Sequence, residues 1–208
     1  MRILAIDASS PVVSLAVCEN GRPLAARTFS VPPRQSAQLL DAVPPLLDEA
    51  GLSFSGLDLV AVGRGPGSYT GLRVAMAAAR AWALPFSIPV WTAPGPRATA
   101  ATLFAADPAR KAVRLAGPVR RGFCWTAVFR RSPGNPAIPV QDGDWTTVPE
   151  ESVDSAALDL PSGTPVNAAH LAFLHSLGVP SDPLSPLYLH PAVNIPPRFD
   201  PLTGTPLS

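Results

Sequence analysis

The chain has 208 residues, of which 47% are hydrophobic and 15% are charged, and its formal net charge is +1. This composition is typical of a folded protein with a sizeable core, and it excludes a disordered chain. A charge so close to zero gives no strong field for nucleic acid or membranes, so any RNA contact must be local or come from a partner. The length fits one large domain or two small ones.

The sequence shows no sign of export or of a membrane span. No apolar run approaches the roughly 20 residues that a spanning helix needs. The opening MRILAIDASS has an aspartate inside its apolar run, so it is typical of a strand rather than a signal peptide. Cys18 and Cys124 fall in strand-like runs, so we expect buried free thiols in a reducing cytoplasm. We therefore expect a cytoplasmic protein with no membrane contact.

The first half of the chain predicts the order β-β-β-α-β-α-β. The pair Asn20-Gly21 is a strong hairpin signal between two strands. Leucines at helical spacing follow, with Ser36 as a plausible N-cap and Gly51 as a plausible C-terminal stop. The pair at 44–45, both prolines, predicts a kink or two short helices there. The expected strands cover 2–7, 12–18, 22–29, 57–62 and a start at 89–91, and the expected helices cover 36–50 and 71–83.

The second half contains many of the 27 prolines and predicts less regular structure. We expect a weak helix at 97–106, strands at 112–116 and 123–130, and a helix at 167–177. The stretch 132–149 is proline-rich, and the tail from Pro180 is expected to be extended. A boundary near residue 100 would divide the chain into an N-terminal lobe, 1–100, and a smaller C-terminal lobe, 101–208.

The stretch GRGPGSYTGLR at 63–73 is a glycine-rich turn between a predicted strand and a predicted helix. The phosphate loop of P-loop proteins needs a lysine, and none is near; the dinucleotide motif G-x-G-x-x-G is also incomplete. Glycines here would allow positive φ and close approach, and the helix that follows has a positive N-terminus. The turn could therefore hold a phosphate, shape a surface for another protein, or be a tight turn and nothing more.

The predicted helix after the turn carries small residues on nearly every face. Leu72, Met76, Ala79 and Ala83 form one stripe, and a helix this small on all sides is expected to be buried on two. The second side could face another layer of the same chain or a partner helix. Arg73 and Arg80, one heptad apart, could rim such a contact.

No group of residues forms a convincing catalytic site. Asp7 ends the first strand beside Ser9 and Ser10, where a carboxylate can hold magnesium-phosphate or simply cap the turn. His170 and His175 are five residues apart and do not share a helix face, and His190 stands alone, so no metal pair exists. The cysteines lack a local base. This pattern favours a binding or scaffold role.

Together these motifs resemble those of the TsaB (YeaZ) family. Its members are subunits of the bacterial complex that makes N6-threonylcarbamoyladenosine in tRNA. The turn at 63–73 is similar to that family's GxGPGSFTGLR-type turn, and IDASS at 6–10 is similar to its IDTS opening. RRGFCWTAVF at 120–129 and PLYLHPAV at 186–193 are similar to its later strand and ending. The chain departs from the family at Gln35, where a histidine is usual, and at Pro118, where an aspartate is usual.

The resemblance implies an actin/Hsp70-like (ASKHA, RNase H-like) α/β fold with two lobes, each with a mixed sheet flanked by helices. It implies a pseudoenzyme with no catalytic residue, metal or cofactor of its own. If the complex binds ATP or ADP, the resemblance implies a site at the joint interface with TsaD. TsaD is the expected heterodimer partner, and TsaE is the second expected partner. The chain is expected to contact tRNA only through the complex. Without TsaD, a homodimer is expected. The rivals are a stand-alone ATPase or small-molecule kinase of this fold and, more remotely, a peptidase.

The resemblance also assigns residues. The expected partner-interface residues on the two helices are Leu39, Leu40, Val43, Leu47, Leu72, Arg73, Ala75, Met76, Ala79, Arg80 and Ala83. The residues expected near a nucleotide are Asp7, Ser9, Arg64, Gly65, Gly67 and Ser68.

Overall fold

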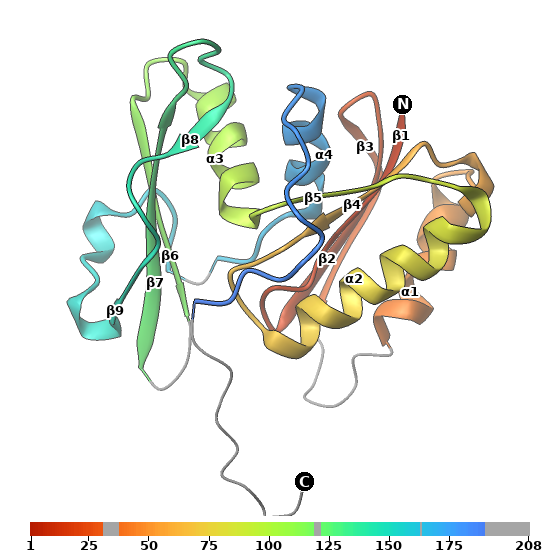
Figure 1. The fold of residues 1–208 in the computed structure, drawn as a ribbon, viewed down its shortest axis with the longest axis horizontal. Coiled ribbons are helices and arrows are strands. Elements are labelled where there is room, and N and C mark those ends of the chain that lie inside the picture. Colours follow the sequence, from red (N-terminus) through yellow and green to blue (C-terminus); the bar gives the residue numbers. More distant parts are fainter. Residues whose placement is uncertain (31–37, 119–121, 163, 190–208) are drawn as a thin grey trace, which may run out of the picture.

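The structure, a computed structural model, describes residues 1–30, 38–118, 122–162 and 164–189, which form two β-sheets with helices on and between them (Figure 1). In this described part of the chain, no helix is long and apolar enough to cross a membrane. The predictions for Gln35, for the N-cap Ser36 and for His190 fall outside the described residues.

Among the described residues, the first sheet contains five strands in the order β3-β2-β1-β4-β5. Its strands are β1 (Arg2–Asp7), β2 (Val12–Glu19), β3 (Arg22–Ser30), β4 (Leu59–Gly63) and β5 (Val90–Ala93). The first three strands pair antiparallel, whereas β4 runs parallel to both β1 and β5, so this sheet is mixed. The predicted hairpin is confirmed, because Asn20 (φ 52°) and Gly21 (φ 78°) have the positive φ angles of a type I′ turn.

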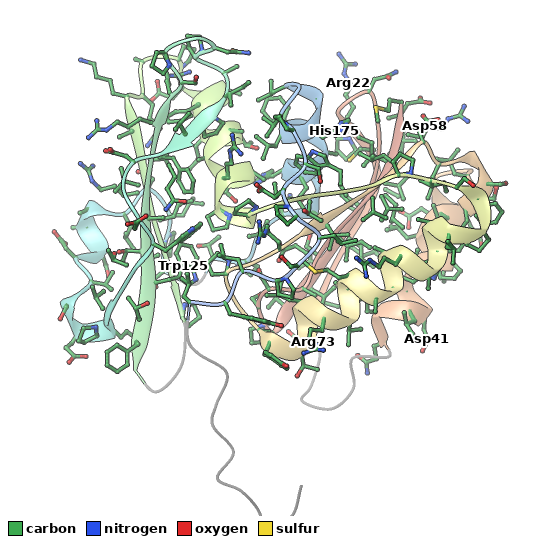
Figure 2. All side chains as sticks on the ribbon, in the orientation of Figure 1. Arg22, Asp41, Asp58, Arg73, Trp125 and His175 are labelled. Carbon is green, nitrogen blue, oxygen red and sulfur yellow. The ribbon has the colours of Figure 1, made fainter. Side chains whose placement is uncertain are left out.

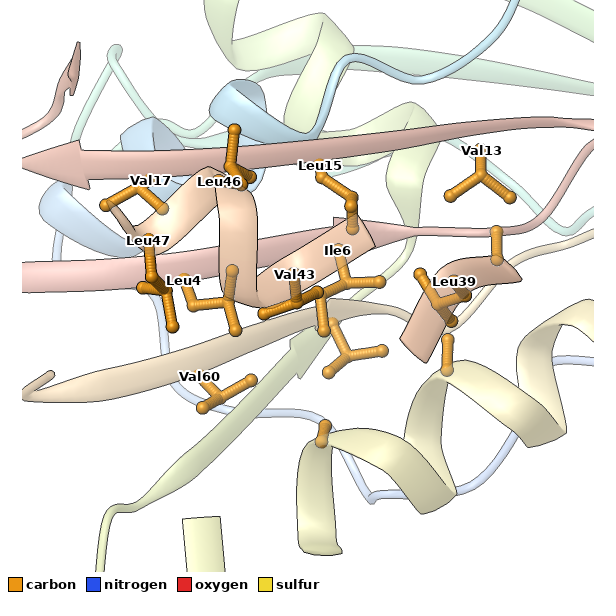
Figure 3. Close-up of a cluster of buried hydrophobic side chains, with 14 of the residues drawn as sticks. Leu4, Ile6, Val13, Leu15, Val17, Leu39, Val43, Leu46, Leu47 and Val60 are labelled. Carbon is orange, nitrogen blue, oxygen red and sulfur yellow. The ribbon is translucent and has the colours of Figure 1, made fainter. Parts of the chain in front are cut away.

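Both faces of the central strands of the first sheet are buried, each under a pair of helices, whereas most residues of β3 are exposed or partly exposed. In β1, Leu4 and Ile6 face one core while Ile3 and Ala5 face the other, because successive side chains of a strand point to opposite faces. The helices are α1 (Gln38–Glu49), α2 (Tyr69–Ala83), α3 (Gly95–Ala106) and α4 (Ala168–Ser176). Figure 3 shows side chains of the first core, which α1 and α2 cover; α3 and α4 cover the second core.

Helix α1 is continuous through its two prolines. The expectation that they divide it into two short helices is wrong. Pro44 and Pro45 are both exposed, so water can satisfy the carbonyls that lose their helical donors. On the opposite side of α1, Val43, Leu46 and Leu47 are buried on the sheet and hold the helix in place.

The second sheet pairs antiparallel throughout its described strands. It contains β6 (Ala112–Pro118), β7 (Phe123–Arg131), β8 (Pro139–Gln141) and β9 (Thr146–Pro149). Phe104 of α3 packs with Trp125 and Phe129 of β7, so α3 joins this sheet to the rest of the molecule. The predicted boundary near residue 100 stays a prediction, but α4, from the C-terminal half, packs on the first sheet (Figure 1).

Candidate functional site

Asp7 lies at the carboxyl end of β1, next to the end of the parallel strand β4, and open α/β sheets bind ligands at the carboxyl ends of such strands. Its Oδ1 accepts hydrogen bonds from the Ser9 amide (3.0 Å) and the Ser9 hydroxyl (2.5 Å). Its Oδ2 accepts no hydrogen bond from the described residues, although Asp7 is only 1% exposed. Burial raises the pKa of Asp7 to about 6, against the two hydrogen bonds from Ser9, which lower it.

The glycine turn is packed tightly against the segment that follows β1. A Cβ atom on Gly63 would lie 1.9 Å from Asp7 Oδ2, and one on Gly67 would lie 1.9 Å from the Ser9 carbonyl oxygen. The Ser68 amide donates to that same oxygen at 2.6 Å. Gly65 has a positive φ of 99°, but Gly67 does not, so Gly67 is required for close approach rather than for its backbone angle.

A C-terminal segment, residues 182–188, covers the outer side of this turn. The Leu187 amide donates to the Arg64 carbonyl at 2.7 Å, and Arg64 faces Asp182 with 4.0 Å between Nη1 and Oδ1. Farther along, the Thr92 hydroxyl donates to the Asp182 carbonyl at 2.8 Å. The structure therefore brings together the residues expected near a nucleotide, namely Asp7, Ser9, Arg64, Gly65, Gly67 and Ser68. Their role toward a nucleotide stays a prediction.

Most of the residues expected at a partner interface face the chain's own core instead. The buried ones are Leu39, Val43, Leu47, Leu72, Ala75, Met76, Ala79 and Ala83. Except for Leu72, these residues belong to the core that packs on the first sheet. In the part of the chain that the structure describes, the other side of α2 carries the exposed Arg73, Ala77 and Arg80, so no second layer of the chain buries it. Leu40, Arg73 and Arg80 are exposed and remain available to a partner. An interface on these helices would therefore use their outward faces.

The outward face of α2 forms one line of residues, which we call the α2 seam: Tyr69, Arg73, Ala77, Arg80 and Leu84. The spacing of four, four, three and four residues keeps these positions on one helix face. Leu84 is 80% exposed and Phe86, just beyond, is 48% exposed. Tyr69, Ala77 and Leu84 were not among the residues predicted for an interface, although their helical spacing is visible in the sequence.

The described residues hold no group of three histidine, cysteine, aspartate or glutamate side chains that could bind a metal ion. Cys18 and Cys124 are buried free thiols, as predicted, and burial raises the pKa of Cys18 to about 11. His170 and His175 lie on α4, and burial lowers the pKa of each.

Comparisons with known proteins point to one family. The sequence profile of TsaD, the tRNA N6-adenosine threonylcarbamoyltransferase, matches residues 31–108, the stretch that contains α1 and α2. The tRNA threonylcarbamoyladenosine biosynthesis protein TsaB of Escherichia coli is 37% identical over 91 residues, which cover 43% of this chain but only 38% of that protein. An uncharacterised protein of Mycobacterium tuberculosis is 31% identical over 198 residues, or 90% of each chain.

Among solved structures, YeaZ from Pseudomonas aeruginosa superposes with a TM-score of 0.70 at 24% identity, over 90% of this chain and 99% of that one. This likeness, with the two sheets described above, places the chain in the predicted actin/Hsp70-like class of α/β proteins. Within that class, the chain belongs to the TsaB/YeaZ family.

Proposed function

We propose that this chain is a non-catalytic, activating subunit of a cytoplasmic complex that makes N6-threonylcarbamoyladenosine in tRNA. It binds a TsaD-family transferase as a heterodimer, and TsaE then joins the pair. The complex modifies the adenosine next to the anticodon of tRNAs that decode ANN codons. Family membership supports the role in this modification, because the curated relative from Escherichia coli is named for it.

The exposed apolar surface on α1 and α2 is the observation that carries the proposal. Leu40 on α1 is 42% exposed, and Leu84 and Phe86 beyond α2 are 80% and 48% exposed. On the α2 seam, Ala77 offers no bulk, so a partner helix can approach the backbone closely. Large apolar side chains that are exposed on and beyond these helices favour an interaction site. A helical partner fits this surface better than a small ligand does.

The glycine turn supports this role by positioning α2. Ser68 caps α2 by accepting a hydrogen bond from the Gly71 amide at 3.2 Å, and the turn before it is fixed on Ser9. In this proposal the chain binds no nucleotide alone, and ATP or ADP belongs at the joint interface with the transferase. Contact with tRNA comes only through the complex.

Size-exclusion chromatography with light scattering tests the proposal. The chain and the TsaD-family protein of the same organism are run separately and then mixed. A new heteromeric peak that replaces the peaks of the separate proteins is the expected result. A mixture whose elution profile is the sum of the two separate profiles would contradict the proposal.

A second candidate function is that of a stand-alone ATPase or small-molecule kinase of the same fold. The observation in its favour is the buried Asp7 at the carboxyl end of β1, whose Oδ2 accepts no hydrogen bond from the residues that the structure describes. ATP turnover by the isolated chain decides between the two. Turnover that disappears in Asp7→Asn would favour the enzyme, and no turnover above that of the variant would favour the scaffold.

A further inference from the structure

Tyr69, Tyr188 and Arg73 form an exposed cluster at the start of α2. The two tyrosine rings are stacked, with centroids 4.9 Å apart and 24° between the ring planes. The Arg73 guanidinium carbon lies 5.1 Å from the centroid of the Tyr69 ring, and Arg73 donates a hydrogen bond to the Tyr69 hydroxyl. Tyr69 is 45% exposed and Tyr188 is 39% exposed. These side chains are ordered against one another while they face solvent, so little conformational entropy remains to be lost on binding.

The cluster is built from two distant parts of the sequence. Tyr69 and Arg73 belong to α2, whereas Tyr188 belongs to the C-terminal segment. That segment is fixed on the glycine turn by the hydrogen bond from the Leu187 amide to the Arg64 carbonyl. A Cβ atom on Gly65 would lie 3.2 Å from the Leu187 carbonyl oxygen, so the turn leaves room for the segment. The C-terminal segment thus adds an aromatic ring to the end of the α2 seam.

The charge of the α2 seam is of one sign. Helix α2 contains Arg73 and Arg80 and has no acidic residue. Arg73 contacts tyrosines, and Arg80 has no hydrogen-bond or ion-pair partner among the residues that the structure describes. From Tyr69 to Leu84 the seam is about 22 Å long at the helical rise of 1.5 Å per residue. A complementary surface must therefore carry carboxylates opposite the two arginines.

We propose that Tyr69, Tyr188 and Arg73 anchor a partner helix of the TsaD-family transferase that lies along the α2 seam. The inference rests on the proposed function and names the chemistry of its interface. The partner helix places a carboxylate against Arg73 and the tyrosine hydroxyls, and a small or apolar ridge over Ala77 and toward Leu84. Tyrosine and arginine are the residues that dominate protein interfaces, and charge-assisted hydrogen bonds to a carboxylate are strong.

A protein helix fits the seam better than RNA does. Stacked tyrosines beside an arginine could also receive a base. However, the seam continues through Ala77 to the exposed Leu84 and Phe86, which offer nothing to phosphate groups. The chain as a whole has a formal net charge of +1, so no positive field extends the arginine pair into an RNA path.

Affinity for the TsaD-family protein of the same organism, measured by calorimetry, tests the anchor. The variants are Arg73→Glu and Tyr188→Ala, and the matched control is Arg22→Glu, an exposed arginine at the opposite end of the molecule (Figure 2). Arg73→Glu and Tyr188→Ala should each raise Kd by about tenfold or more. Arg22→Glu should change Kd by less than about twofold. Circular dichroism and thermal melting confirm that each variant is folded.

The outcomes separate the anchor from the proposed function. If the natural chain binds the transferase and both Arg73→Glu and Tyr188→Ala bind equally well, the anchor is wrong while the proposed function stands. If the natural chain does not bind the transferase, both the anchor and the proposed function are contradicted. If the variants keep their affinity for the transferase but the complex loses tRNA retention, the cluster is an RNA contact and the anchor is again overturned. Arg73→Glu changes an exposed helix position, so the test survives even if Tyr188→Ala fails to fold.

Discussion

At the scale of single residues, Asp7 makes the fold less stable at neutral pH. Burial raises its pKa from 3.8 to about 6, so this carboxyl favours the folded state below pH 3.8 and loses that advantage as the pH rises through 6. The full difference is worth on the order of 3 kcal/mol. A buried carboxylate with an unpartnered oxygen is a common sign of a functional position.

Asp7→Asn should therefore stabilise the fold above pH 6. The amide oxygen can keep both hydrogen bonds from Ser9, and no charge needs to be buried. Urea unfolding of both proteins across pH 4 to 8 should show a difference that is small at pH 4, grows toward pH 6 and then stays level. The same difference at every pH would contradict a raised pKa for Asp7.

Gly67 is required by the packing of the turn on the β1 end. A Cβ atom there would lie 1.9 Å from the Ser9 carbonyl oxygen, which is backbone and cannot rotate away. Gly67→Ala should therefore lower the free energy of unfolding by about 1–3 kcal/mol. Gly134→Ala is the matched control, because a Cβ atom on Gly134 would meet none of the described residues within 4 Å. Equal stability of the two variants would show that the turn can move away from Ser9.

At the scale of elements, much of the first sheet could be predicted because its signals are local. The Asn20-Gly21 turn predicts the hairpin by its residue types alone, and the buried run of β2 precedes it. Strands β8 and β9 were missed in a stretch that prolines made unpromising. Pro139 begins β8 and Pro149 ends β9, and proline is tolerated at the ends of such short strands. Here pairing with β7 decides the structure, and pairing is not a local signal.

The candidate site shows the same division between local and distant information. The turn at 63–73 is visible in the sequence, but its contact with Ser9 depends on β1 and β4 being parallel neighbours. The position of Tyr188 beside Tyr69 depends on the return of the C-terminal segment. For α2, the stripe of Leu72, Met76, Ala79 and Ala83 is visible in the sequence and is buried in the structure. The sequence could not tell what covers the other side of a helix with so many small residues.

The two faces of α2 give a matched pair of variants. Ala79 is 0% exposed, so Ala79→Glu buries a charge and should lower the free energy of unfolding by at least about 3 kcal/mol. Ala77 is exposed on the same helix, so Ala77→Glu should change stability by no more than about 0.5 kcal/mol while it blocks a partner helix. Urea unfolding and co-purification with the transferase measure both effects. A stable, fully folded Ala79→Glu protein would mean that α2 packs differently on the sheet.

At the scale of the whole molecule, the exposed surface on α1 and α2 predicts self-association when the transferase is absent. Helix α2 carries Arg73 and Arg80, while Asp41 and Asp48 are exposed on α1, so a second copy related by a two-fold axis can bring opposite charges together. Leu84, 80% exposed at the end of the α2 seam, would be buried in such a dimer. The apolar contact supplies affinity, and the charges set the orientation.

Leu84→Asp should therefore weaken the homodimer by about tenfold without unfolding the chain, because Leu84 has almost no contact to lose. Light scattering across a dilution series measures the dimer constant, and Leu24→Asp, at a 46% exposed leucine of β3, is the control. The natural chain and Leu24→Asp should dimerise alike, and Leu84→Asp should be monomeric over most of the series. If all three dimerise equally, the dimer uses another face. In that case competition between a second copy and the transferase, which the shared surface demands, would also be absent.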